Sequence, residues 1–259
     1  MKTTCEQCRH FQILALAGLL AFSPFCGLAV VSGLNPTADA FVTTGPSGNL
    51  SPNNYGGAGA LSVAAPGLGQ GEFQSVLQFG LSGIKGAFDS QFGAGGWTVQ
   101  SVTLQLTAVP PANPIFNASA AGQFSISWMQ NDTWIEGTGN PSAPTTTGIT
   151  FSTLSNFVSL ADEALGTFGF NGATSGNAIY NLNLTPSFTA DILAGNTLSL
   201  RLFAADSSVS YLSDSRSFGT VSARPLLSIT AVPEPGALSL GALGLCLWGS
   251  SRLRRATHR

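Results

Sequence analysis

The stretch Val99–Ala108, VQSVTLQLTA, decides the fold that this sequence predicts. Its apolar residues Val102, Leu104 and Leu106 alternate with Thr and Gln, and this period of two is typical of a strand with one buried and one solvated face. The stretch Thr197–Phe203, TLSLRLF, alternates in the same way. Both stretches therefore predict strands of an antiparallel sheet that covers a core on one side only.

Further strands are expected where short apolar or alternating runs lie between turns rich in Gly, Pro and Asn. These runs are residues 60–64, 73–79, 124–128, 149–154, 164–170, 178–184, 209–212 and 226–230. Pro186 is expected to open a short helix that ends at Leu193, and residues 80–96 and 132–147 are expected to be connections. Many short strands with one minor helix predict an all-β fold, an antiparallel β-sandwich or jelly roll.

The composition agrees with a folded, turn-rich domain. Charged residues are 8% of the 259 residues, against roughly 25% in an average globular protein. Low charge together with 31 Gly also fits a disordered chain, but 17 Phe residues supply apolar surface that can offset the entropy of ordering. We therefore expect one β-rich domain between residues 41 and 231.

Residues 1–40 resemble a secretory signal peptide. Lys2 and Arg9 form a positive start, and residues 11–22 form an apolar run of suitable length. Ala38-Asp39-Ala40 then offers the small residues that signal peptidase requires, so cleavage is expected before Phe41. The alternative is an uncleaved N-terminal anchor.

The C-terminal residues 232–259 contain a second candidate targeting signal. Pro233-Glu234-Pro235 is followed by the uncharged stretch 236–251 and then by Arg252, Arg254 and Arg255. A helix over this stretch would be roughly 24 Å long, somewhat shorter than the roughly 30 Å hydrocarbon core that it is expected to cross. The arginine cluster should stay in the cytoplasm, which places the preceding domain outside.

This order of Pro-Glu-Pro, apolar helix and arginine cluster resembles the PEP-CTERM sorting tail. The resemblance implies recognition by an exosortase, in a Gram-negative-type bacterium that makes exopolysaccharide. It also implies a membrane-anchored precursor that becomes a cell-surface or extracellular protein. A plain C-terminal anchor that no sortase recognises is the alternative.

The predicted domain lacks the residue types that several kinds of binding and catalysis require. Residues 41–231 hold four basic against nine acidic residues, a formal charge of −5, and a domain without a basic stripe is unsuited to nucleic acid. All Cys and His residues lie outside this range, which excludes Ser-His-Asp and Cys-His catalysis and the usual zinc sites. A carboxylate pair, as in glycosidases, or an oxygen-ligand site for Ca²⁺ remains.

The order of motifs in the domain resembles the DNRLRE-type domain, a jelly-roll module of secreted bacterial proteins, some of which bind polysaccharide. The matching stretches are Asn54-Tyr55-Gly56, Leu61–Val63, Val76–Leu81, Val102–Leu106, Trp134-Ile135-Glu136-Gly137, Asn140-Pro141, Tyr180–Thr185, Ser215-Arg216 and Arg224–Leu227. The chain departs from the pattern at Gly80, where the family has Asp, and at Phe218, where an acid often stands.

Four residues are candidates for a site. Trp97 and Trp134 are the candidate glycan-binding residues, because sugar sites stack an aromatic face on the pyranose ring; the alternative for both is core packing. Asp132 and Glu136 flank Trp134 and are the candidate ligands for a structural Ca²⁺ ion, and also the candidate glycosidase pair. The alternative is an Asx turn at Asp132 and an ion pair between Glu136 and Arg216.

Together these features predict an exported, non-enzymatic β-sandwich that associates with polysaccharide at the cell surface or in the extracellular matrix. A structural surface protein without a specific ligand is one alternative. A carboxylate-based glycan hydrolase or lyase is the other.

Overall fold

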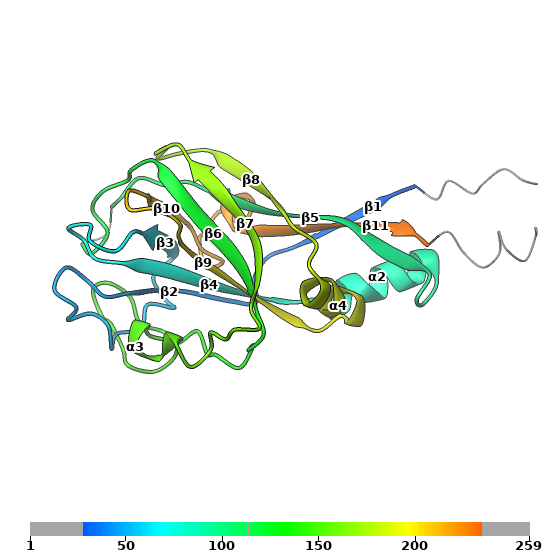
Figure 1. The fold of residues 1–259 in the computed structure, drawn as a ribbon, viewed down its shortest axis with the longest axis horizontal. Helices are drawn as coiled ribbons and strands as arrows, with labels where there is room; N and C mark the ends of the chain where they lie inside the picture. Colours follow the sequence, from blue (N-terminus) through cyan, green and yellow to red (C-terminus); the bar gives the residue numbers. More distant parts are fainter. Residues whose placement is uncertain (1–27, 113, 235–259) are drawn as a thin grey trace, which may run out of the picture. The chain divides into compact units, whose positions relative to one another are not determined.

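The computed structural model describes residues 28–112 and 114–234 (Figure 1). The chain divides into a compact unit, Val30–Ala231, and a second unit made of residues 1–29 and 232–259. The predicted signal residues 1–27, most of the sorting motif (Pro235, Arg252, Arg254 and Arg255) and the predicted membrane helix 236–251 lie outside the described residues. Within residues 28–112 and 114–234, no helix is both long enough and apolar enough to cross a membrane.

The compact unit contains two antiparallel β-sheets. In the described residues the smaller sheet has the order β1 (Val30–Leu34), β11 (Leu226–Pro233), β5 (Trp97–Thr107), β8 (Asn177–Leu182). The larger sheet has the order β10 (Ser210–Asp214), β3 (Ala60–Ala64), β4 (Phe73–Gly80), β9 (Thr197–Ala204), β6 (Gly122–Met129), β7 (Glu163–Phe170), and β2 (Ala38–Thr43) also pairs with β4. The predicted all-β class with antiparallel sheets is confirmed.

The main core is formed by the alternate residues of both sheets. Val102, Leu104 and Leu106 on β5 are at most 1% exposed, as the alternation predicts, and Leu198, Leu200 and Leu202 on β9 belong to the same cluster. Burying each such side chain contributes roughly 1.5–3 kcal/mol. The period of two is therefore the direct cause of the layered arrangement.

The folded unit begins earlier than the predicted boundary at Phe41. β1 pairs with β11 from Val30–Ala231 to Leu34–Leu227, and β2 pairs with β4 from Ala38–Gln78 to Thr43–Phe73. Phe41 is 0% exposed and lies in the middle of β2. The boundary prediction is therefore corrected: the compact unit starts at Val30, and the stretch before Phe41 provides two of its strands.

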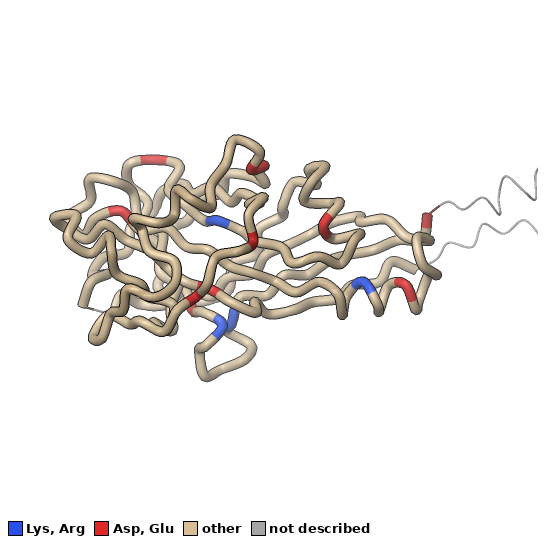
Figure 2. Tube along the Cα trace, turned by 90° about the horizontal axis from the view of Figure 1, so that it is seen from below, with Lys and Arg blue, Asp and Glu red and all other residues tan. Residues whose placement is uncertain are grey.

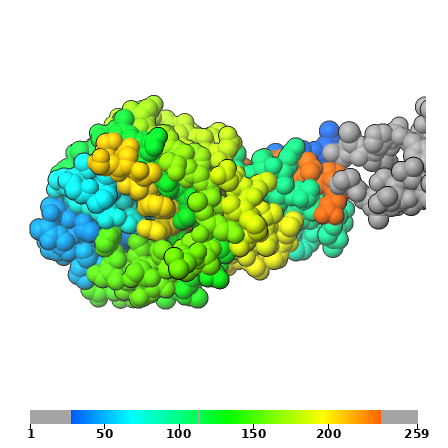
Figure 3. Space-filling model, viewed as in Figure 1, coloured from blue at the N-terminus to red at the C-terminus, as the bar shows by residue number. Residues whose placement is uncertain are grey.

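Two helices of the structure, α2 and α3, were not predicted, whereas a third, α4, was predicted. Residues 82–92, expected to be a connection, form α2 (Ser82–Phe92), and the expected strand 149–154 contains the short helix α3 (Phe151–Leu154). The helix expected from Pro186 is α4 (Pro186–Ala194), which contacts α2 at one end of the unit (Figure 1). The segment around α3, light green in Figure 3, covers one side of the larger sheet.

Candidate functional site

The two candidate glycan-binding tryptophans are core side chains. Trp97 is 3% exposed and its indole N–H donates to Asp89 Oδ1 at 2.9 Å, while its ring packs 4.9 Å from that of Phe88. Trp134 is 4% exposed, and its indole N–H donates to Ser199 Oγ at 3.0 Å. A buried indole with its N–H satisfied has no free face for a pyranose ring, so core packing describes both residues.

Glu136 forms the ion pair that was the alternative to a cation site. The Arg216 guanidinium donates to both carboxylate oxygens of Glu136, and Glu136 Oε1 also accepts the backbone N–H of Asp39 at 3.2 Å. The Asx turn forms at Asn131, whose Oδ1 accepts from the Thr133 backbone N–H at 2.9 Å, and not at Asp132. The Glu136 carboxylate is therefore committed to contacts within the protein.

Asp132 stands apart from that ion pair. Burial raises the pKa of its carboxyl against the lowering effect of Ser199, and its buried Oδ1 atom makes no hydrogen bond of good geometry within the described residues. The described ranges 28–112 and 114–234 contain no group of three or more His, Cys, Asp or Glu side chains that could hold a metal ion.

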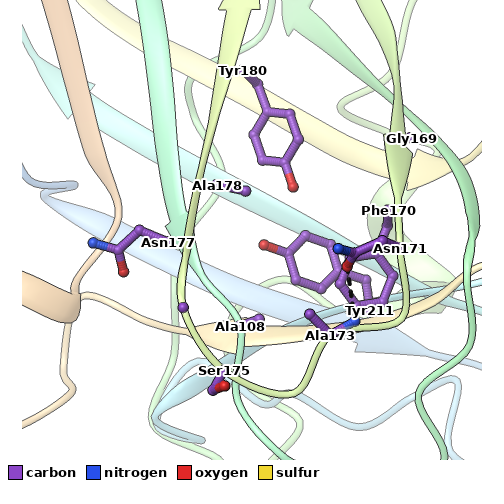
Figure 4. A pocket seen from close by; sticks show the side chains of 11 residues that line it. Ala108, Gly169, Phe170, Asn171, Ala173, Ser175, Asn177, Ala178, Tyr180 and Tyr211 are labelled. Atoms are coloured by element: carbon purple, nitrogen blue, oxygen red, sulfur yellow. Dashed lines mark hydrogen bonds between the residues drawn. The ribbon is translucent and has the colours of Figure 1, made fainter.

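A pocket between the two sheets is the better candidate site. It has a volume of about 230 Å³ and lies beneath the loop that joins β7 to β8, with Phe170, Asn171, Ser175, Tyr180 and Tyr211 among its lining residues (Figure 4). Pockets that hold drug-sized ligands are roughly 300–1,000 Å³, so this tyrosine pocket suits one small group such as a single sugar ring.

Aromatic side chains from different sheets build the tyrosine pocket. Tyr180 lies on β8 of the smaller sheet and Tyr211 on β10 of the larger sheet. The Tyr211 ring stacks on Phe170 with the ring centroids 4.0 Å apart, and the Tyr180 ring meets Phe124 edge-on at 5.1 Å. These contacts fix both rings and leave their hydroxyls directed into the pocket, toward each other (Figure 4).

The hydroxyl of Tyr211 is the unusual feature of this pocket. Tyr211 is 2% exposed, and within the described residues its hydroxyl makes no hydrogen bond of good geometry, although it interacts with the hydroxyl of Tyr180. Burial raises the pKa of Tyr211 and of Tyr180, so both phenols stay neutral donors at physiological pH. An unpaired buried hydroxyl costs about 1–3 kcal/mol, which a bound group with its own hydroxyls would recover.

The pocket is electrically neutral, and the surroundings offer little charge. None of its lining residues is Asp, Glu, Lys or Arg. Figure 2 shows the basic and acidic residues scattered over the unit without a stripe of either sign. The pocket therefore suits a neutral, hydroxyl-bearing ligand and gives no charge-based selection.

Little in the amino-acid sequence predicts a site at these two tyrosines. Tyr180 occupies an inward position of β8, and Tyr211 lies on β10, whose residues are all buried, so both resemble ordinary core residues. The two tyrosines lie close together because the two sheets pack face to face, and local periodicity does not encode that packing. A tyrosine at an inward position, where Leu or Val is usual, is the single signal available, because its hydroxyl needs a partner there.

Comparison with known proteins adds no family. No family model matches the chain, and no curated protein matches it significantly.

Proposed function

We propose that this chain is an exported, non-enzymatic protein of the cell surface or extracellular matrix, whose β-sandwich, of the jelly-roll type, associates with polysaccharide. Signal peptidase and an exosortase are the proposed processing partners, and the sorting tail supports delivery through the membrane. The observation that carries the binding function is the tyrosine pocket, with its unpaired Tyr211 hydroxyl aimed into a neutral, aromatic-walled space.

The chemistry of the pocket favours a sugar over other small neutral ligands. A sugar carries several hydroxyls, which the Tyr211 and Tyr180 phenols can bind, while the buried Phe170 ring supplies part of the apolar wall of the pocket. The candidate glycosidase pair does not favour catalysis, because Glu136 is bound to Arg216. Binding without turnover is therefore the function that the geometry supports best.

The test is affinity electrophoresis of the full-length chain, purified in mild detergent, through gels that contain neutral or acidic polysaccharides. We expect retardation by at least one polysaccharide, and a reduction of about tenfold in affinity for Tyr211→Phe and Tyr180→Phe. Tyr211→Phe should leave the free energy of unfolding unchanged or raise it, because it removes an unpaired buried hydroxyl. This combination of weaker binding and undiminished stability separates a ligand site from a core position.

The matched control is Tyr55→Phe. Tyr55 is equally buried, 1% exposed, but its hydroxyl accepts from Asn53 Nδ2 at 3.2 Å in a different cluster. We expect normal retardation of this variant. If no polysaccharide retards the folded chain, the protein is a structural surface component without a specific ligand.

A further inference from the structure

Arg201 lies in a second hollow, which shares no lining residue with the tyrosine pocket. This arginine groove is lined by Gln74, Phe151, Leu154, Ser155, Val158 and Arg201 and has a volume of about 290 Å³. Strands β4 and β9 form its floor, and α3 with the residues after it forms one wall. The groove therefore joins an apolar wall to one positively charged group.

The guanidinium of Arg201 is held in place without an ion pair. Its Nε–H donates to Gln74 Oε1 at 2.7 Å, and its Cζ lies 4.3 Å from the centroid of the Phe203 ring. In the ranges 28–112 and 114–234 the two ion pairs within 4.0 Å are Lys85–Asp89 and Glu136–Arg216. Arg201 is thus oriented by a neutral amide and an aromatic face, with its Nη groups free of carboxylates.

An unpaired, half-buried cation is costly unless something pairs with it. The nearest acidic residues, Glu72 and Asp162, interact with Arg201 electrostatically only, and their carboxylates accept other hydrogen bonds, from Gln74 Nε2 and from the backbone N–H of Gln130. Ser127, which is paired with Arg201 in the register of β6 and β9, is 8% exposed, and its hydroxyl has no hydrogen-bond partner among the residues that the structure describes. On this face of the sheet a guanidinium without an ion pair and an unpaired hydroxyl therefore lie on neighbouring strands.

We propose that the arginine groove binds the carboxylate of a sugar acid, with the Arg201 guanidinium as the group that pairs with it. A guanidinium matches a carboxylate through two parallel N–H···O bonds. One cation in an acidic domain fits a monoanion better than a phosphate dianion. The wall of Phe151, Leu154 and Val158 offers contact to the apolar face of a ring. The choice of a sugar rests on the proposed function, whereas the choice of a carboxylate rests on Arg201 alone.

Calorimetric titration of the full-length chain with sodium glucuronate tests this assignment. At low salt we expect saturable binding, at least about tenfold tighter than for glucose or for the methyl ester of glucuronate, and weaker at high salt. Arg201→Gln should lose about tenfold or more in affinity. The control Arg224→Gln, which removes an exposed guanidinium bound to the Phe218 carbonyl, should bind as the unmodified chain does.

A second measurement needs no variant. Phenylglyoxal modifies accessible arginines, and glucuronate should protect Arg201 and leave Arg224 reactive, as peptide mass mapping would show. Equal affinity for glucose and glucuronate, unchanged binding by Arg201→Gln, or absence of protection would overturn the proposal. Equal binding of N-acetylalanine would overturn the sugar and point to a peptide carboxylate. Tyr211→Phe should keep glucuronate binding, so failure of the tyrosine pocket and failure of this groove are distinguishable.

Discussion

Asp39 is a buried carboxyl in an unusual setting. It is 1% exposed on β2; its Oδ2 accepts the backbone N–H of Arg216 at 2.7 Å, and its own N–H donates to Glu136. Burial raises the pKa of Asp39 from 3.8 to about 7, against the opposing effect of the Arg216 N–H and with the support of the negative Glu136. The folded protein therefore holds a proton that the unfolded chain releases at lower pH.

This difference predicts that stability falls as pH rises. Between about pH 4 and about pH 7 the unfolded state binds fewer protons at Asp39, so the free energy of unfolding decreases across that window and is level above it. Burial raises the pKa of Asp214 to about 6, which adds a decrease of the same sign. Asp39→Asn, which keeps an oxygen for the Arg216 N–H, should be more stable than the unmodified chain at pH 8 and show a flatter curve.

Urea denaturation of both proteins from pH 4 to pH 8 measures this difference. The gain at pH 8 should be on the order of 2 kcal/mol. The two curves should converge toward pH 4, where the Asp39 carboxyl is protonated in the folded state. Curves that run parallel over the whole range would mean that Asp39 does not take up the proton.

Asn54 shows how one amide can organise three loops. Its Nδ2 donates to the carbonyls of Glu136 and Ile149 at 2.6 and 2.7 Å, and its Oδ1 accepts the backbone N–H of Gly56 and Gly139 at 3.2 and 3.1 Å. Two of the stretches that resemble the DNRLRE-type domain meet here, together with a neighbouring segment. The first stretch is the Asn-Tyr-Gly turn, the second contains Glu136, and the neighbouring segment is the one before Asn140.

Truncation of this amide should be severe. Asn54 is 0% exposed, so Asn54→Ala leaves four buried backbone groups unpaired, and we expect a loss of about 3 kcal/mol or more in the free energy of unfolding. Asn53→Ala, which removes one bond to the Tyr55 hydroxyl, is the neighbouring control and should cost about 1 kcal/mol or less. If chemical denaturation gave both variants the same loss in free energy of unfolding, the four hydrogen bonds of Asn54 would contribute no more than the single bond of Asn53.

At the scale of elements, helix α4 receives its N-terminal cap from another strand. Thr185 precedes the helix without a side-chain cap, and Glu163 on β7 supplies the acceptor instead. The Glu163 carboxylate accepts the backbone N–H of Ser187 at 3.0 Å and of Phe188 at 3.1 Å, and the Thr185 hydroxyl also donates to it. Although burial acts to raise it, these hydrogen bonds lower the pKa of Glu163 below its ordinary value.

Glu163→Gln should therefore loosen the start of α4. The carboxylate stabilises the fold above its ordinary pKa and loses that effect as pH falls, and its neutral replacement should cost about 1 kcal/mol at neutral pH. Hydrogen exchange should accelerate at the Ser187 and Phe188 amides. Glu72→Gln, whose carboxylate accepts from Gln74 Nε2 and no helix amide, should leave both amides protected; a similar acceleration there would contradict the cap.

The predicted strands agree with the structure where a period of two reports burial directly. The expected strand 60–64 coincides with β3, and the Thr197–Phe203 stretch lies within β9. α2 escaped prediction because Gly83 and Gly86 lower helix propensity, and the helix depends on packing of Ile84 and Phe88 against the core. The Thr150–Phe151 start of α3 resembled a strand, because its capping bond to Thr153 is a local geometry that alternation does not report.

The candidate site was harder to predict than the fold, for a related reason. The ion pair of Glu136 with Arg216 was one of the alternatives that the sequence left open. The tyrosine pocket joins β8 to β10 across the two sheets, and the arginine groove depends on which faces α3 covers. Long-range placement of polar groups within apolar strands carries no local signature, so only the three-dimensional arrangement reveals both hollows.

At the scale of the whole molecule, the strands before Phe41 conflict with removal of residues 1–40. Cleavage there would delete β1 and divide β2, leaving the β11 edge unpaired and removing Ala40 from the cluster that contains Val42, Val76 and Trp134. A loss of buried apolar surface and of strand pairing is serious for a domain that is stabilised by only roughly 5–15 kcal/mol. The mature protein should therefore keep residues from Val30 onward.

A cleavage position compatible with the fold lies directly before that strand. Gly27 and Ala29 are small residues spaced as the −3 and −1 subsites require, so we predict that signal peptidase cuts between Ala29 and Val30. Mass spectrometry of the N-terminal peptide of the exported protein checks this position. Ala29→Leu should block processing, whereas Ala40→Leu should leave processing intact and destabilise the fold, because Ala40 is 1% exposed. A mature N-terminus at Phe41 would contradict the prediction and require that β11 and β4 function without β1 and the first half of β2.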